Sequence, residues 1–233
     1  MSVTTRDLVI PGAVAPGFYA APAAPKAAIV VCHEIFGRAP EIERVCLRLA
    51  EAGFAALMPD LFGDRSKPLC IARALGQIAR GEGEFIDVIV SAADVVAAES
   101  GVDRARVGVI GFCLGGGFAL ATGKVFKATS TNYGDLPPVE VMKGIGPTIG
   151  CYGSMDRVYG KAGTELSKRL TVLDVPHEVH SFEAGHAFLA DGSHPVAEAL
   201  TRFIINVDAE RDTAAREAAW PKIISFFDQQ LRA

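Results

Sequence analysis

The sequence predicts an α/β fold in which a mostly parallel sheet carries helices on both faces. Short apolar, β-branched runs alternate with longer segments whose apolar residues recur at helical spacing. This alternation is typical of strand–helix–strand units, because each crossover helix returns the chain to the same edge of a parallel sheet. No linker, low-complexity tract or internal repeat interrupts the pattern. We therefore expect one domain over residues 1–233.

The first half of the chain contains the clearest elements. The continuous apolar run Ala27–Cys32 predicts a buried strand. Pro40–Ala52 places apolar residues on one helical face and charges on the other, and Gly53 is a typical helix terminator. The remaining elements expected in this half are a strand over Phe54–Met58, helices over Ser66–Arg80 and Glu84–Ser100, and a strand over Arg106–Ile110.

The second half begins with a tight glycine-rich turn over Gly111–Gly117. Asn132–Gly146 is the most loop-like segment, and Pro221 predicts a kink or a break in the last helix. The expected elements are helices over Phe118–Val125, Gly163–Leu173 and Ala209–Leu231, and strands over Lys127–Tyr133, Pro147–Tyr152 and His177–Phe182.

Composition excludes several classes of protein. The 233 residues can bury a core without disulfides, and 23 basic against 27 acidic residues leave no basic patch for nucleic acid. The apolar runs are too short to span a membrane, and the N-terminus lacks a signal-peptide pattern. Five cysteines without close pairs argue against a disulfide framework or a metal site. We expect a soluble, reduced, cytoplasmic protein.

The turn at Gly111–Gly117 reads GFCLGGG and lies between a predicted strand and a predicted helix. That context is required of a nucleophile elbow, in which a sharp turn lifts one side chain above the sheet edge. The nucleophile would be Cys113, and the Leu114 N–H at the helix start would bind a developing oxyanion. Two alternatives stay open. One is a phosphate-binding turn, although the dinucleotide and P-loop signatures are missing, and the other is an inert buried thiol.

An elbow of this kind predicts an acid and then a histidine further along the chain. Asp156 follows a predicted strand and a glycine turn, and His186 follows the last predicted strand after a glycine. Either residue could instead be a turn-capping carboxylate or a solvated loop histidine. The other candidates are Asp135 and Asp174 for the acid, and His177, His180 and His194 for the histidine.

Four stretches of sequence resemble the dienelactone hydrolase family (carboxymethylenebutenolidases), a cysteine branch of the α/β-hydrolases. They are CHEIFG at Cys32–Gly37, MPDLF at Met58–Phe62, GFCLGG at the elbow and EAGHAF at Glu183–Phe188. The similarity extends over nearly the whole chain, from about Val3 to Phe227. It implies a single-domain α/β-hydrolase fold with Cys113 as nucleophile, Asp156 as acid and His186 as base. It implies no metal and no organic cofactor.

The resemblance also gives roles to two residues after the first buried strand. Glu34 would hydrogen-bond the resting thiol and accept its proton when substrate binds, which protects the thiol from oxidation between turnovers. Ile35 would offer its backbone N–H as the second oxyanion donor beside Leu114. The alternative for Glu34 is a strand-end carboxylate paired with Arg38.

The expected function is hydrolysis of a small ester or lactone through a thioester on Cys113. Relatives that act on dienelactone carry an arginine shortly after the catalytic histidine, whereas this chain has Ala187–Ala190 there. Candidate substrate contacts are Tyr133, Arg73, Arg80 and Arg38, each of which could instead be a packing or surface residue. Two alternatives remain, a non-catalytic ligand-binding protein and a redox pair of Cys113 with Cys32 or Cys151. The sequence specifies no oligomeric state.

Overall fold

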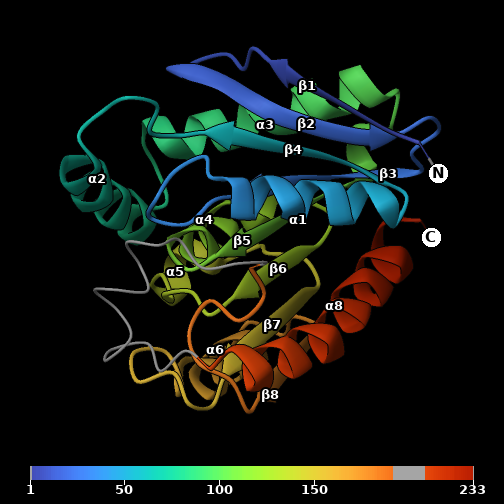
Figure 1. The fold of residues 1–233 in the computed structure, drawn as a ribbon. Helices are drawn as coiled ribbons and strands as arrows, with labels where there is room; N and C mark the ends of the chain where they lie inside the picture. Colours follow the sequence, from blue (N-terminus) through green and yellow to red (C-terminus); the bar gives the residue numbers. More distant parts are fainter. Residues whose placement is uncertain (1, 191–207, 233) are drawn as a thin grey trace.

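A computed structural model describes residues 2–190 and 208–232, which form an eight-stranded sheet with helices on both faces (Figure 1). The strand order is β1-β2-β4-β3-β5-β6-β7-β8. Six strands from β4 to β8 are parallel, and β2 and β1 add an antiparallel edge. The predicted fold class is therefore confirmed.

Most predicted elements are present with similar bounds, but β1, β2 and α5 were not predicted, and α4 begins at Leu114, four residues before the expected start at Phe118. The strands are β1 (Val3–Leu8), β2 (Ala15–Pro22), β3 (Ala27–Cys32), β4 (Phe54–Asp60), β5 (Val107–Phe112), β6 (Thr129–Asn132), β7 (Thr148–Gly153) and β8 (His177–Phe182). The helices are α1 (Pro40–Glu51), α2 (Lys67–Arg80), α3 (Glu84–Ser100), α4 (Leu114–Thr122), α5 (Val139–Met142), α6 (Ala162–Val172) and α8 (Ala209–Leu231).

The glycine-rich turn is tighter than the sequence predicts. Strand β5 continues to Phe112 and helix α4 starts at Leu114, so Cys113 alone makes the turn. The glycines that follow are the first residues of a buried helix, where they let α4 approach the sheet. A second difference concerns Pro221, which lies within a continuous α8 and does not divide it.

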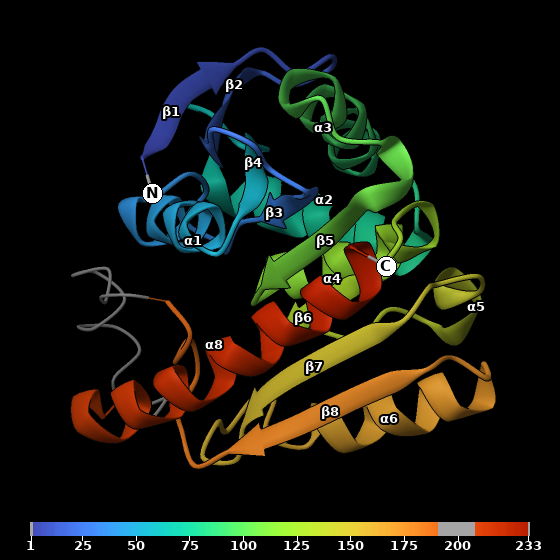
Figure 2. The same cartoon turned by 90° about the vertical axis from the view of Figure 1, so that its right-hand side faces the viewer.

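Two helical layers enclose the sheet. Helices α1 and α8 cover one face, and α2 to α6 cover the other (Figure 2). Strand β3 is buried on both sides, which explains its continuous apolar sequence. No helix in the described ranges has the length and apolar character needed to cross a membrane.

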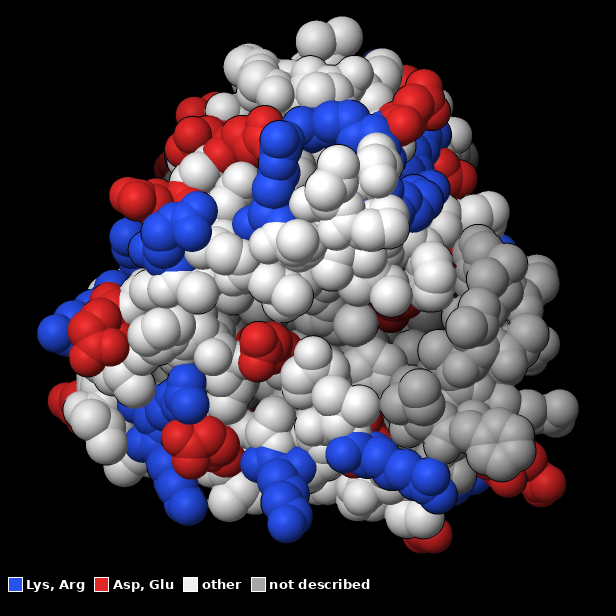
Figure 3. Space-filling model, turned by 90° about the vertical axis from the view of Figure 1, so that its left-hand side faces the viewer, with Lys and Arg blue, Asp and Glu red and all other residues white. Residues whose placement is uncertain are grey.

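The parallel strands all end at the left-hand edge of Figure 1. Ligands of open α/β sheets bind at this carboxyl-terminal edge, because the loops there converge from neighbouring strands. Figure 3 shows this face of the molecule. Its centre consists largely of uncharged side chains, and most of the Lys and Arg side chains lie around the rim.

Candidate active site

Cys113 occupies a strained turn at the end of β5. Its backbone has φ 52° and ψ −118°, a conformation that residues with a Cβ rarely adopt. The turn fits only because Gly115 has no side chain. A Cβ there would overlap the carbonyl group of Cys32 and lie 2.7 Å from the carbonyl oxygen of His33. The sequence GFCLGGG therefore holds the half-buried thiol at the sheet edge, next to the segment that follows β3.

Asp156 and His186 form a short buried pair. His186 Nδ1 donates to Asp156 Oδ2 over 2.7 Å, and the two side chains are 10% and 0% exposed. The other carboxylate oxygen, Oδ1, accepts the backbone N–H groups of Val158 and Tyr159 at 2.8 and 3.0 Å. The carboxylate is thus fixed by three donors, which leaves Nε2 of the imidazole for proton transfer.

The ionisation of this pair follows from its contacts. Burial would lower the pKa of His186, but hydrogen bonding and charge from Asp156 and Cys113 raise it to about 10. Burial would raise the pKa of Asp156, but the hydrogen bond and charge of His186 lower it. The contacts therefore favour a protonated imidazole held by the ionised carboxylate of Asp156.

The loop that carries His186 is anchored to two other segments. Asp212, near the start of α8, accepts the Gly185 N–H at 2.9 Å, and Trp220 Nε1 donates to the Leu189 carbonyl at 3.2 Å. On its other side the loop meets the end of β7. A Cβ on Gly153 would overlap the Ala184 carbonyl and lie 2.5 Å from the Gly185 oxygen. These contacts bring the acid loop and the histidine loop together.

Glu34 lies at the same edge, directly after β3. Its Oε1 accepts the hydroxyl of Tyr133 at 3.3 Å, whereas Arg38 pairs with Asp7 and Glu43 at 2.9 and 2.7 Å. The structure thus disfavours the salt bridge from Glu34 to Arg38. Burial raises the pKa of Glu34 and outweighs the opposing effects of His186 and Tyr133. A carboxyl group with a raised pKa is a suitable proton acceptor for a thiol.

Two tyrosine rings contact the imidazole of His186. Tyr133, which is fully buried and has φ 41°, lies edge-on with its ring centroid 5.0 Å away. Tyr159 lies 5.5 Å away at an interplanar angle of 30°. Tyr159 was not among the residues singled out from the sequence. Its only signal was its position three residues after Asp156, and only the fold shows that this loop bends back over the imidazole.

The backbone N–H groups of Ile35 and Leu114 indicate where an oxyanion could bind. Strands β3 and β5 are parallel neighbours in which Cys32 pairs with Gly111. Ile35 and Leu114 each lie three residues beyond these partners, so the register brings them to the same level. Within residues 2–190 and 208–232, neither of their N–H groups donates to a protein acceptor. Free N–H groups at this edge are what an oxyanion requires.

The other acid and histidine candidates that the structure describes have different partners. Asp135 is exposed and binds the Leu136 N–H, and Asp174 follows α6. His177 is bonded to Ser167 at 2.9 Å, and His180 to Glu178 at 3.2 Å. His194 lies outside the described residues.

The two arginines proposed as substrate contacts, Arg73 and Arg80, are on exposed positions of α2. Arg73 is 62% exposed and pairs with Glu84 at 3.6 Å. Tyr133 packs beneath His186 and is itself inaccessible to solvent. Substrate binding by these three residues stays a prediction.

All five cysteines are free thiols, and they differ sharply in exposure. Cys113 is half-buried, whereas Cys32, Cys46, Cys70 and Cys151 are buried. Burial raises the pKa of Cys32 and Cys46, and raises that of Cys151 to about 12. The raised pKa keeps the thiols of Cys32, Cys46 and Cys151 uncharged at neutral pH, as expected of small core residues.

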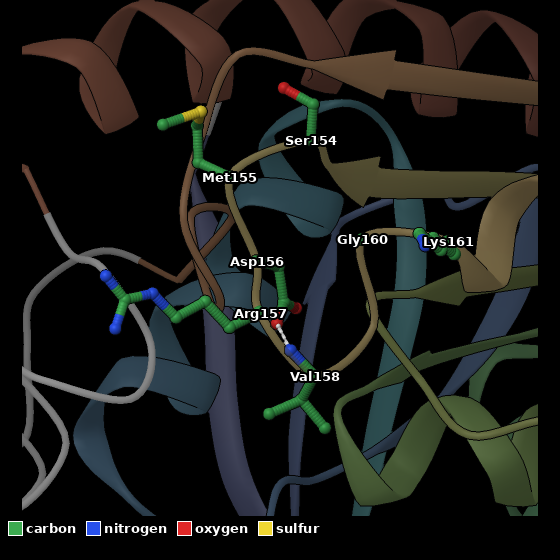
Figure 4. A pocket seen from close by; sticks show the side chains of 7 residues that line it. All are labelled: Ser154, Met155, Asp156, Arg157, Val158, Gly160 and Lys161. Atoms are coloured by element: carbon green, nitrogen blue, oxygen red, sulfur yellow. Dashed lines mark hydrogen bonds between the residues drawn. The ribbon is translucent and has the colours of Figure 1, made fainter.

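An open pocket of about 570 Å³ lies on the loop that follows β7 (Figure 4). Its wall combines apolar groups with two cations, and Asp156 is part of it while Cys113 is not. The lining residues are Ser154, Met155, Asp156, Arg157, Val158, Gly160 and Lys161. The picture shows Asp156 turned inward to bond the Val158 N–H, and Arg157 extending away from it.

Comparison with known proteins agrees with this geometry. The sequence model of the dienelactone hydrolase family matches residues 15–231. A carboxymethylenebutenolidase of Rhodococcus opacus is 28% identical over 227 residues, covering 87% of this chain and 81% of the relative. The fold matches a dienelactone hydrolase from Anabaena variabilis with a TM-score of 0.70 and 18% identity, over 99% of both chains. It also matches a dienelactone hydrolase-like promiscuous phosphotriesterase from metagenomic libraries, with a TM-score of 0.78 and 23% identity over 99% of both chains. The match over almost the entire sequence shows that this chain belongs to the dienelactone hydrolase family.

Proposed function

We propose that this protein hydrolyses small carboxylic esters or lactones through a thioester formed on Cys113. Family membership gives the class of reaction, hydrolysis of an ester or lactone bond. The observation that carries the mechanism is the 2.7 Å hydrogen bond from His186 to Asp156. The same imidazole also interacts with the thiol group of Cys113. These contacts support a Cys–His–Asp triad, because nucleophile, base and orienting acid occur in one chain of contacts.

In the first half-reaction, the Cys113 thiolate attacks the acyl carbon and forms a carbon–sulfur bond. The negative charge that develops on the carbonyl oxygen is bound by the N–H groups of Ile35 and Leu114. The carbon–oxygen bond to the leaving group then breaks, and His186 gives its Nε2 proton to the departing oxygen.

In the second half-reaction, His186 takes a proton from water, and the resulting hydroxide attacks the thioester carbon. The carbon–sulfur bond breaks, the acid product leaves, and the thiolate and imidazolium are restored. Asp156 keeps the imidazole in the required tautomer throughout. When substrate enters, Glu34, with its raised pKa, would accept the thiol proton of resting Cys113, and it would return this proton to the thiolate after the acid product has left.

The substrate is proposed to be small and to differ from dienelactone itself. The residues that follow His186 up to position 190 include no arginine, and the exposed Arg73 is paired with Glu84. A bound carboxylate would require a cation to offset its loss of hydration. We therefore expect uncharged esters and lactones to be turned over faster than their carboxylated analogues.

A direct test is to trap the acyl-enzyme. The wild type and Cys113→Ala are mixed with p-nitrophenyl acetate and with an uncharged lactone, and the intact protein mass is followed. We expect one acyl group on the wild type, located at Cys113 by peptide mapping, and none on the variant. The buried Cys151→Ala is the matched control and should acylate normally. Full activity of Cys113→Ala would reject the triad. Binding without turnover in every protein would instead indicate a non-catalytic ligand-binding role.

A further inference from the structure

His33 is a buried histidine that none of the steps above uses. It is 1% exposed and lies between the end of β3 and Glu34. Both of its ring nitrogens are bonded to main-chain groups. Nδ1 lies 2.7 Å from the carbonyl oxygen of Glu34, and Nε2 lies 3.1 Å from the amide nitrogen of Leu61.

These partners define the protonation state of the ring. A carbonyl oxygen can only accept and an amide N–H can only donate, so the proton is on Nδ1 and Nε2 is the acceptor. The ring is therefore neutral. Burial lowers the pKa of His33, which favours the same state. The Phe62 ring, edge-on at a centroid distance of 4.9 Å, holds the imidazole from the side.

The carbonyl that His33 binds belongs to the same peptide unit as the Ile35 N–H. The structure contains no cis peptide among the described residues, and a trans peptide is planar, so its C=O and N–H point in opposite directions. The direction of the Glu34 carbonyl therefore determines the direction of the Ile35 N–H. A second bond to this carbonyl, from the Gly37 N–H at 3.1 Å, closes the turn over Glu34–Gly37.

We propose that His33 is a positioning residue that aims the Ile35 N–H at the substrate carbonyl oxygen. Nδ1–H fixes the Glu34–Ile35 peptide plane, and Leu61, from the segment after β4, fixes the imidazole. Donation to the carbonyl also polarises the peptide and strengthens its N–H as a donor. This inference rests on the proposed function, because it assumes that the Ile35 N–H binds the oxyanion of the acylation step.

The test separates acylation, which creates an oxyanion, from alkylation, which does not. His33→Leu removes both hydrogen bonds and keeps an apolar side chain in the core. We expect the rate of acylation of Cys113 by p-nitrophenyl acetate to fall about 10²–10³-fold, as for loss of one oxyanion donor. Alkylation of Cys113 by iodoacetamide should stay within about twofold of the wild type, since attack at a tetrahedral carbon needs no oxyanion site.

Two conservative variants identify which hydrogen bond matters. His33→Asn places an amide N–H near the position of Nδ1 and can still donate to Glu34, so it should recover at least tenfold in acylation over His33→Leu. His33→Gln places a carbonyl near the position of Nε2 and restores only the bond with Leu61, so it should recover less. Unchanged acylation in His33→Leu, a parallel fall in alkylation, or rescue by Gln and not by Asn would each overturn the proposal.

Nitrogen-15 NMR of the histidine rings gives a readout that is independent of activity. The signals missing from the His33→Leu spectrum belong to His33 and should show a neutral ring protonated on Nδ1. A ring protonated on Nε2, or a charged ring, would overturn the inference while leaving the proposed triad intact. Failure of the wild type to acylate at all would instead reject the triad, and with it the role given to the Ile35 N–H.

Discussion

Backbone strain at Cys113 can be measured in two variants that both lack the thiol. The φ of 52° and ψ of −118° at Cys113 are expected to cost about 1–3 kcal/mol for any residue with a Cβ. Glycine relieves this strain but gives up about 0.4–1 kcal/mol, because its unfolded chain has more conformational freedom. The difference predicts that Cys113→Gly is more stable than Cys113→Ala by roughly 0.5–2 kcal/mol.

The assay is urea denaturation followed by tryptophan fluorescence. Trp220 is the single tryptophan of the chain and is 1% exposed, so its emission reports on unfolding. Both variants are inactive under the proposed mechanism, so the comparison uses only the free energy of unfolding. Calorimetry provides an independent check, because a difference of 1 kcal/mol shifts the melting temperature of a chain of this size by about 2–4 °C.

An ordinary helical position supplies the control. Ala72 is exposed in the middle of α2, and Ala72→Gly should destabilise the protein by about 1 kcal/mol. The reasoning predicts opposite signs for the same alanine-to-glycine difference at positions 72 and 113. If the glycine form were less stable than the alanine form at both positions, the backbone at Cys113 would carry no strain, and the reasoning would be refuted.

Three further predictions follow from the burial and ionisation of the site. One of the five thiols should react with Ellman's reagent in the native protein and all five in denaturant, because only Cys113 is not buried; Cys113→Ala should show none in the native state, and a second reactive thiol would contradict the assignment. The pKa of His186 is raised from 6.5 to about 10, so its stabilising contribution is complete below about pH 6.5 and is lost as the pH rises through 10. At the acid side the lowered pKa of Asp156 acts in the opposite sense, with stability lost as the pH falls below 3.8. The advantage of the wild type over His186→Gln in denaturation experiments should therefore shrink between pH 6.5 and 10, and a constant advantage would disprove the ionic pair. Finally, Gly153→Ala should cost about 3 kcal/mol or more and reduce activity, because its Cβ would meet the backbone of the His186 loop. The control Gly76→Ala, which meets only the movable Arg80 side chain, should be neutral or stabilising in the same unfolding measurement.

The parallel core of the sheet could be predicted from local pattern alone. Strand β3 is a continuous apolar run because it is covered on both faces, and α3 was predicted with its observed bounds. The antiparallel strands were missed for a physical reason. β1 is polar and mostly exposed, and β2 contains two prolines and a glycine, so neither has the hydrophobic period of a strand. Their pairing depends on neighbours distant in sequence.

The candidate site, like the fold, was predictable only in part from the sequence. The chain order of Cys113, Asp156 and His186 predicted a triad, because the elbow motif demands a particular local backbone, and the structure bears out the buried contact between Asp156 and His186. The partners of these residues could not be predicted. Arg38 was a reasonable neighbour for Glu34 four residues away, yet it pairs with Asp7 and Glu43, and Glu34 is bonded by Tyr133 from the end of β6.

By itself, the sequence determined which residues can do chemistry and which local turns present them, since a glycine-flanked cysteine after a buried strand has few backbone conformations open to it. The tertiary structure decided everything that depends on distance between strands. It set the 2.7 Å contact between Asp156 and His186, which are 30 residues apart in the chain. It also set the β3–β5 register that brings Ile35 beside Leu114, and the two hydrogen bonds by which the His33 imidazole joins the ends of β3 and β4. The physical reason is that proton transfer and oxyanion binding act over about 3 Å, and only the packing of the sheet brings separate chain segments that close.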